Sequence, residues 1–192
     1  MPVRYRAKKF EVFTIGHSTH PIAEFVEILK ANGVKRVVDI RTIPRSRHNP
    51  QFNGEALAES LHAAGIGYTH IKKLGGLRHP AKDSINLGWR NSGFRGFADY
   101  MQTPEFEAGL ERAIKLAKAK PSALMCAEAV PWRCHRSLVA DALSVRKISV
   151  MDILSATRAS AHKITPFALV RGSRITYPDE KIRRGRKKMK RI

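Results

Sequence analysis

The sequence is poor in cysteine: its 192 residues include only Cys126 and Cys134, too few for a disulfide framework. It has no apolar run near the roughly 20 residues that a membrane-spanning helix needs. Its first ten residues lack the apolar stretch of a secretory signal. We therefore expect a cytoplasmic protein in a reducing compartment, with no membrane partner. The 43% hydrophobic content excludes a wholly disordered chain.

Acidic residues are scarce as well: 16 Asp and Glu stand against 36 Lys and Arg, which gives a formal net charge of +20. Residues 179–192 hold eight basic side chains, Lys187 and Lys188 among them, and only two acidic ones. We expect a single domain over 1–178 and a mobile basic tail over 179–192. The excess charge extends through the domain too, and it favours nucleic acid or another polyanion as partner. The alternative is that the charge only keeps the protein soluble.

Apolar patterning predicts strands that alternate with helices. The predicted strands are 10–15, 34–40, 66–71, 122–126 and 148–153. The predicted helices are 21–31, 55–64, 96–101, 104–119 and 135–144. Segments 161–169 and 175–177 are ambiguous. This alternation predicts an α/β fold, a mostly parallel sheet with helices on both faces, and right-handed crossovers place all strand carboxyl ends on one edge.

Unusual polar residues follow the first two strands at that edge. His17 comes after the first strand; it is either a loop histidine or an acid/base group. Asp39 ends the second strand, where a buried carboxylate needs a partner, and Arg41 is the nearest candidate. We prefer this orienting role for Asp39 over a catalytic one. A cluster of hydrogen-bond donors follows, made up of Arg41, Arg45, Ser46 and Arg47. We expect these side chains to bind phosphate rather than form a solvated basic loop.

The loop after the third strand offers two weaker signals. Gly75 and Gly76 permit close backbone approach to a phosphate, although they do not match a phosphate-loop pattern. Aromatic and basic residues interleave further on: Trp89, Arg90, Phe94, Arg95 and Phe97. They would either stack on the bases of a nucleic acid or hold the loop on the protein body.

The fourth strand ends at Cys126, and Cys134 begins the last predicted helix. A helix start beside cations lowers the pKa of a thiol, so Cys134 is a candidate nucleophile. The same helix start, with His135 and Arg136, is alternatively an anion site. Cys126 is a buried small residue or a resolving thiol. Glu128 is the preferred acid/base group, with a salt bridge to a nearby arginine as the alternative.

Five motifs in order resemble a known family. They are TIGHS (14–18), VDIRTIPRSR (38–47) with QFN (51–53), LGGLR (74–78), FRGFADYM (94–101) and MCAEAVPWRCHRSLVADAL (125–143). Over about 10–178 the chain resembles the domain of unknown function 488 family. The resemblance implies a compact bacterial or archaeal α/β protein. It also implies a histidine within 150–154, where this chain has Asp152, and a later histidine that is similar to His162.

Three functions are consistent with these residues. The first is an enzyme that hydrolyses a phosphodiester or glycosidic bond in nucleic acid or a nucleotide, with no cofactor expected. The absence of a carboxylate cluster disfavours a two-metal nuclease. The second is a nucleic-acid-binding protein without catalysis. The third is a redox or sulfur-transfer protein that uses Cys134, with Cys126 as its resolving partner.

Overall fold

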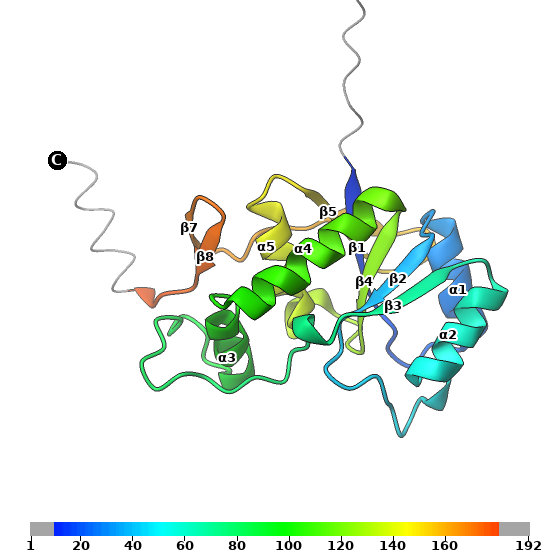
Figure 1. The fold of residues 1–192 in the computed structure, drawn as a ribbon, viewed down its shortest axis with the longest axis horizontal. Helices are drawn as coiled ribbons and strands as arrows, with labels where there is room; N and C mark the ends of the chain where they lie inside the picture. The colour runs from blue at the N-terminus through cyan, green and yellow to red at the C-terminus, as the bar shows by residue number, and fades with distance from the viewer. Residues whose placement is uncertain (1–9, 181–192) are drawn as a thin grey trace, which may run out of the picture.

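The computed structural model describes residues 10–180, whose strands form a six-stranded sheet and a separate hairpin (Figure 1). The strand order in the sheet is β3-β2-β4-β1-β5-β6, and all neighbours pair in parallel except β5 and β6. The sheet strands are β1 (Glu11–Gly16), β2 (Arg36–Asp39), β3 (Gly67–His70), β4 (Ser122–Cys126), β5 (Ser149–Ile153) and β6 (Ala159–Ala161). The hairpin joins β7 (Leu169–Arg171) to β8 (Arg174–Thr176).

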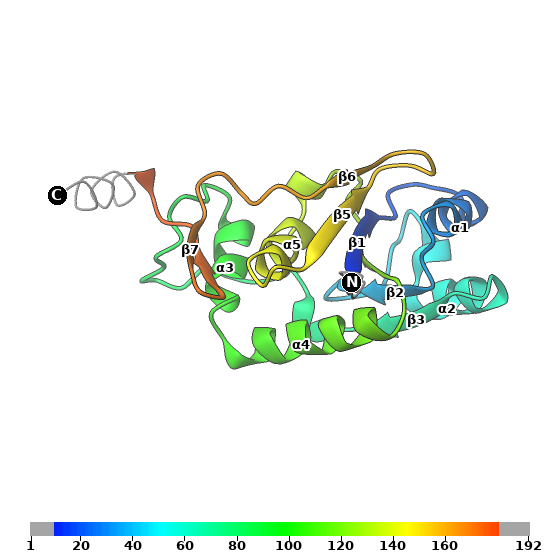
Figure 2. The same cartoon turned by 90° about the horizontal axis from the view of Figure 1, so that it is seen from above.

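Helices cover both faces of this sheet, which confirms the expected α/β class. The helices are α1 (Ile22–Ala31), α2 (Gly54–Ala63), α3 (Ser92–Tyr100), α4 (Pro104–Ala119) and α5 (Arg136–Ser144). Figures 1 and 2 show α1 and α2 together on one side of the sheet, with α4 and α5 on the other. Short 3₁₀ turns occur at η1 (Pro50–Phe52), η2 (Lys72–Leu74) and η3 (Pro131–Arg133).

Each sheet face has its own apolar core because successive strand side chains point to opposite faces. Val37 packs in the core under α1 and α2, whereas Val38 packs in the core under α4 and α5. The same alternation along β4 places Met125 in the first core and Cys126 in the second. A strand buried on both faces accounts for the continuous apolar runs in the sequence.

The structure differs from the sequence expectation in two places. The helix expected over 96–101 begins earlier, at Ser92, because the Asn91 side chain accepts a hydrogen bond from the Phe94 backbone N–H and caps the helix. The ambiguous C-terminal segments form the short strands β6, β7 and β8. The expected basic tail, with Lys187 and Lys188, lies outside the described residues.

The order of the strands makes the carboxyl end of β4 a natural ligand site. The chain leaves β1 through α1 on one face of the sheet and leaves the adjacent β4 through α5 on the other face. Open α/β sheets bind ligands where neighbouring strands lead to opposite faces. The last residue of β4 at this position is Cys126.

A buried polar network ties the C-terminal segment to the sheet. The His162 ring lies between two carboxylates, with Nε2 2.8 Å from Asp141 Oδ1 and Nδ1 3.1 Å from Asp152 Oδ2. The hydroxyl groups of Tyr177 and Thr14 donate to the same two carboxylates. Burial alone would lower the pKa of His162, but the hydrogen bonds and charges of the two carboxylates outweigh it and raise the pKa to about 9.

Protonated His162 therefore makes a pH-dependent contribution to stability. Because the folded pKa of about 9 lies above the ordinary value of 6.5, this contribution is fully present below pH 6.5. It is lost as the pH rises through 9, and it amounts to about 3 kcal/mol. We expect His162→Gln to be less stable than the wild type in urea denaturation at pH 6, with a smaller gap at pH 10. A gap of equal size at both pH values would contradict this role.

Candidate functional site at the carboxyl ends of β1, β2 and β4

Three central strands end at the same edge, and backbone hydrogen bonds join the residues just beyond them. The His17 N–H donates to the Cys126 carbonyl at 2.9 Å, and the Ile40 N–H donates to the Met125 carbonyl at 3.0 Å. In the register of the sheet, Gly16 lies opposite Cys126. The loops after β1, β2 and β4 therefore meet, as the sequence predicts.

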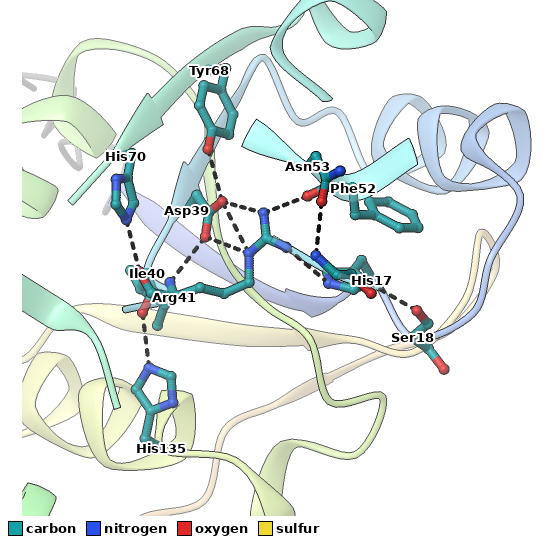
Figure 3. Close-up of polar contacts among 11 residues, drawn as sticks. His17, Ser18, Asp39, Ile40, Arg41, Phe52, Asn53, Tyr68, His70 and His135 are labelled. Atoms are coloured by element: carbon teal, nitrogen blue, oxygen red, sulfur yellow. Dashed lines mark hydrogen bonds and ion pairs between the residues drawn. The ribbon is translucent and has the colours of Figure 1, made fainter. Parts of the chain in front are cut away.

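The expected pairing of Asp39 with Arg41 is confirmed, and both side chains are buried (Figure 3). Arg41 Nη2 lies 2.6 Å from Asp39 Oδ2, and its Nε and backbone N–H donate to the same carboxylate. The Tyr68 hydroxyl adds a further donor at 2.8 Å. The Phe52 carbonyl accepts from Arg41 Nη2 at 2.8 Å. Most of the Arg41 donors are thus used inside the protein, which limits its expected role in binding phosphate.

His17 belongs to the same cluster. Its Nδ1–H donates to the Ser18 carbonyl at 2.9 Å, so Nε2 faces Arg41 Nη1 at 3.3 Å as the acceptor. The ring stacks on Phe52 with centroids 4.1 Å apart. Burial, with the nearby Arg41 charge, lowers the pKa of His17 to about 4. The ring is therefore neutral at pH 7, and it contacts Arg41 rather than lining the cavity described below.

Two further histidines hold the end of β2 (Figure 3). His70 Nε2 donates to the Arg41 carbonyl at 2.8 Å, and His135 Nε2 donates to the Ile40 carbonyl at 3.1 Å. Gly75 and Gly76 pack beside these contacts. A Cβ at Gly76 would collide with the His135 ring, and one at Gly75 would lie 2.5 Å from Thr42 Oγ1. The two glycines allow their loop to approach β2 closely.

A cavity of about 270 Å³ opens above this edge. Its lining includes apolar side chains from three separate segments, namely Ile43, Leu77 and Phe94. Both cysteines, Arg41, Glu128, Arg133 and His135 also line it. Of the residues expected to act together, the structure brings Arg41, Gly76, Glu128, Cys134 and His135 to one cavity, whereas His17 lies behind Arg41.

Arg136, which the sequence analysis expects to bind phosphate, is fully buried and is not among the residues that line the cavity. Its Nη1 lies 2.8 Å from Cys126 Sγ and also donates to the Glu128 carbonyl. Its Nη2 donates to the Ala129 carbonyl at 2.8 Å. Gly16 makes room for this arrangement, because a Cβ there would collide with the Glu128 carbonyl and lie 2.7 Å from Arg136 Nη1.

The remaining predicted residues lie around the cavity or away from it. Arg45 and Arg47 are exposed on the loop after β2, while Ser46 shapes that loop by donating its N–H to Asn53 Oδ1 and accepting from the Asn49 N–H. Trp89 and Phe94 stack on each other, 4.7 Å between centroids. Trp89 also contacts Phe167 and Tyr177, so it holds the loop on the protein body. Arg90 is exposed and Arg95 is half-buried.

Several residues of the site had no signal in the sequence. Tyr68 and Phe52 contact the Asp39–Arg41 pair only because β3 and the turn η1 fold against β2. His70 ends β3 and was recognisable only by its position at a strand end. Within residues 10–180 we find no group of three or more side chains suited to hold a metal ion. In the same range, no helix combines the length and apolarity needed to cross a bilayer.

The architecture and the cavity define an α/β protein with a buried arginine–thiol cluster at the carboxyl ends of its central strands. Residues 21–143 match the family model described as "Domain of unknown function DUF488". This match spans more than half of the sequence, and the chain belongs to that family. Searches of curated proteins and of solved structures find no match.

The Asp39–Arg41 pair generates a stability prediction. Asp39→Asn leaves a buried guanidinium without its counter-charge, and we expect a loss of about 3–5 kcal/mol in the free energy of unfolding. Tyr68→Phe is the matched control, because it removes a single hydrogen bond from the same carboxylate and should cost about 1 kcal/mol. Urea denaturation monitored by tryptophan fluorescence measures both. Equal losses in the two variants would show that the charge is unimportant.

Proposed function

We propose that the protein is an enzyme that acts on a phosphate-bearing substrate, either a nucleotide or a nucleotide unit of nucleic acid, bound in the carboxyl-end cavity. The observation that carries this proposal is the composition of the cavity. Its apolar walls suit a nucleobase, its arginine side chains suit a phosphate, and its carboxylate suits a proton transfer.

The apolar walls favour a planar ring. Ile43 and Leu77 line the cavity and are 59% and 70% exposed, although side chains of this kind are usually covered. Phe94 supplies an aromatic surface beside them. Trp132, which adjoins the cavity residue Arg133, is 72% exposed. A nucleobase would cover these apolar surfaces, which a small inorganic anion would leave in water.

Three exposed arginines favour phosphate. Arg133 lines the cavity, and Arg45 and Arg47 lie on the loop that also supplies Ile43. Within residues 10–180, none of the three side chains has a recorded hydrogen bond or ion pair. Their donors are thus available to phosphate, in contrast to those of Arg41 and Arg136. The net charge of +20 raises the encounter rate with polyanions.

Glu128 is the proposed acid/base group. Its side chain is exposed and lines the cavity, while its backbone carbonyl is held by Arg136. Within the described residues its carboxylate has no recorded hydrogen bond or ion pair, so no internal contact competes with a substrate or a water molecule. A carboxylate in this position supports hydrolysis of a phosphodiester or a glycosidic bond.

Turnover assays with labelled DNA, RNA and free nucleotides test this function. We expect Glu128→Gln to lower turnover by about 100-fold or more, the typical contribution of general acid–base catalysis. We expect Arg133→Ala to raise the KM. Glu111→Gln is the matched control, because Glu111 is an exposed carboxylate on α4 that lies outside the cavity lining.

Full turnover in Glu128→Gln would remove this residue from the mechanism. Binding of nucleic acid without turnover by the wild type would instead indicate a non-catalytic binding protein. In that case the logarithm of the affinity should fall steeply with the logarithm of the salt concentration.

A further inference from the structure

Arg136 is a buried cation without a carboxylate partner. Its side chain is fully buried, and no ion pair to it is recorded within residues 10–180. Three acceptors surround its terminal nitrogens: the Glu128 and Ala129 carbonyls and Cys126 Sγ. Its Nε has no hydrogen-bond partner. Asp152 interacts electrostatically with this cation without an ion pair to it, and a neighbour in direct contact that supplied negative charge would stabilise it further.

Cys126 is the neighbour that can do so. The two carbonyls are neutral, whereas a thiol becomes an anion when it loses its proton, and Arg136 Nη1 lies 2.8 Å from Sγ. Burial raises the pKa of the Cys126 thiol, but its hydrogen bond with Cys134 and the Arg136 charge more than offset this and lower the pKa below its ordinary value. The thiolate form of Cys126 is therefore favoured relative to an ordinary cysteine. Cys126 lines the cavity but is only 1% exposed, so a disulfide has to reach it through the cavity.

Cys134 is the second thiol of the cluster and keeps its proton. The hydrogen bond to Cys126 and burial raise the pKa of Cys134 well above its ordinary value. Its Sγ lies 3.5 Å from His135 Nδ1 and accepts the Arg136 backbone N–H at 3.5 Å. His135 donates Nε2–H to the Ile40 carbonyl, and burial lowers its pKa to about 4, so Nδ1 is an unprotonated acceptor. While Cys126 is a thiolate, the single Cys134 proton is used in the hydrogen bond to it. Once Cys126 is bonded to another sulfur atom, His135 Nδ1 is the neighbouring acceptor for that proton.

We propose that Cys126 and Cys134 form a reactive thiol pair that exchanges with disulfides, with Cys126 as the attacking thiolate and Cys134 as the resolving thiol. The Cys126 thiolate attacks one sulfur of a disulfide RSSR, forms a mixed disulfide and releases RS⁻. Cys134 then passes its proton through His135 to that thiolate. Its own sulfur attacks Cys126 Sγ, which forms the Cys126–Cys134 disulfide and releases the second RS⁻. The two cysteines are oxidised as RSSR is reduced to two thiols.

This activity is independent of hydrolysis in the same cavity. It requires the two sulfurs, Arg136 and His135, whereas the proposed hydrolysis requires the Glu128 carboxylate and the exposed arginines. Failure of one proposal therefore leaves the other standing. Glu111→Gln serves as a control here, since Glu111 is an exposed carboxylate on α4 that lies outside the cavity lining.

Oxidised glutathione and intact-mass measurement on the full chain test the pair. We expect the wild type to lose both free thiols without gaining an adduct, because Cys134 displaces the first glutathione. Cys134→Ser should accumulate one glutathione on Cys126. Cys126→Ser should react roughly tenfold more slowly near pH 6.5, because its remaining thiol is protonated there. A wild type that retains glutathione, or equal rates in the two variants, would overturn the proposal.

The pH dependence of alkylation supplies a second measurement that needs no substitution. We expect iodoacetamide to label Cys126 of the wild type with a midpoint below the ordinary thiol value of about 8.5, read by peptide mapping. A midpoint near the ordinary thiol value of about 8.5 would overturn its role as the attacking thiolate. The charged and titratable groups around Cys126 and its cavity are Arg136, Cys134, His135, Glu128, Arg133 and Arg41.

Discussion

The buried ion pair between Asp39 and Arg41 fixes the edge of the sheet on which the cavity is built. Asp39 ends β2, and its carboxylate receives the Arg41 backbone N–H and guanidinium together with the Tyr68 hydroxyl. Arg41 in turn holds the Phe52 carbonyl and the His17 ring. One carboxylate thereby organises β3 and the segments that follow β1 and β2. Without the Asp39 carboxylate, the start of the loop that carries Ile43 and the exposed arginines would lose the hydrogen bonds that fix its position.

The two buried arginines of the edge illustrate two ways to balance charge inside a protein. Arg41 has a permanent anion, Asp39, and its geometry is that of a structural pair. Arg136 faces backbone carbonyls and a sulfur atom, so an ionised Cys126 would be the anion in direct contact with it. A permanent pair contributes rigidity. A pair whose anion is a thiolate contributes chemistry, because the anion is also a nucleophile.

Much of the fold was predictable because its signals are local. The helix over 104–119 and the strand over 122–126 lie where apolar periodicity and the proline at the helix start place them. The strands β6, β7 and β8 were not predictable because each has three residues. The segment that carries them is held by tertiary contacts, chiefly the hydrogen bonds of His162 to Asp141 and Asp152.

For the site, sequence reasoning identified the edge and most of its polar residues, since strand order alone brings them together. It assigned Arg41 and Arg136 to a substrate, and the only internal acceptor that it identified for either arginine was Asp39. The acceptors that it missed are the Phe52 carbonyl for Arg41, and backbone carbonyls with the Cys126 sulfur for Arg136. Cys126 looked like a small buried residue for the same reason. Its importance comes from a side chain ten positions further along the chain, which only folding brings into contact.

Gly16 carries a consequence for how this sequence can change. Every other amino acid would place an atom where the Glu128 carbonyl and the Arg136 guanidinium lie. A substitution there would disturb at once the end of β1, the turn after β4 and the cation that faces Cys126. A substitution of Gly16 is therefore tolerated only if the turn after β4 changes its conformation as well, so this glycine is difficult to replace.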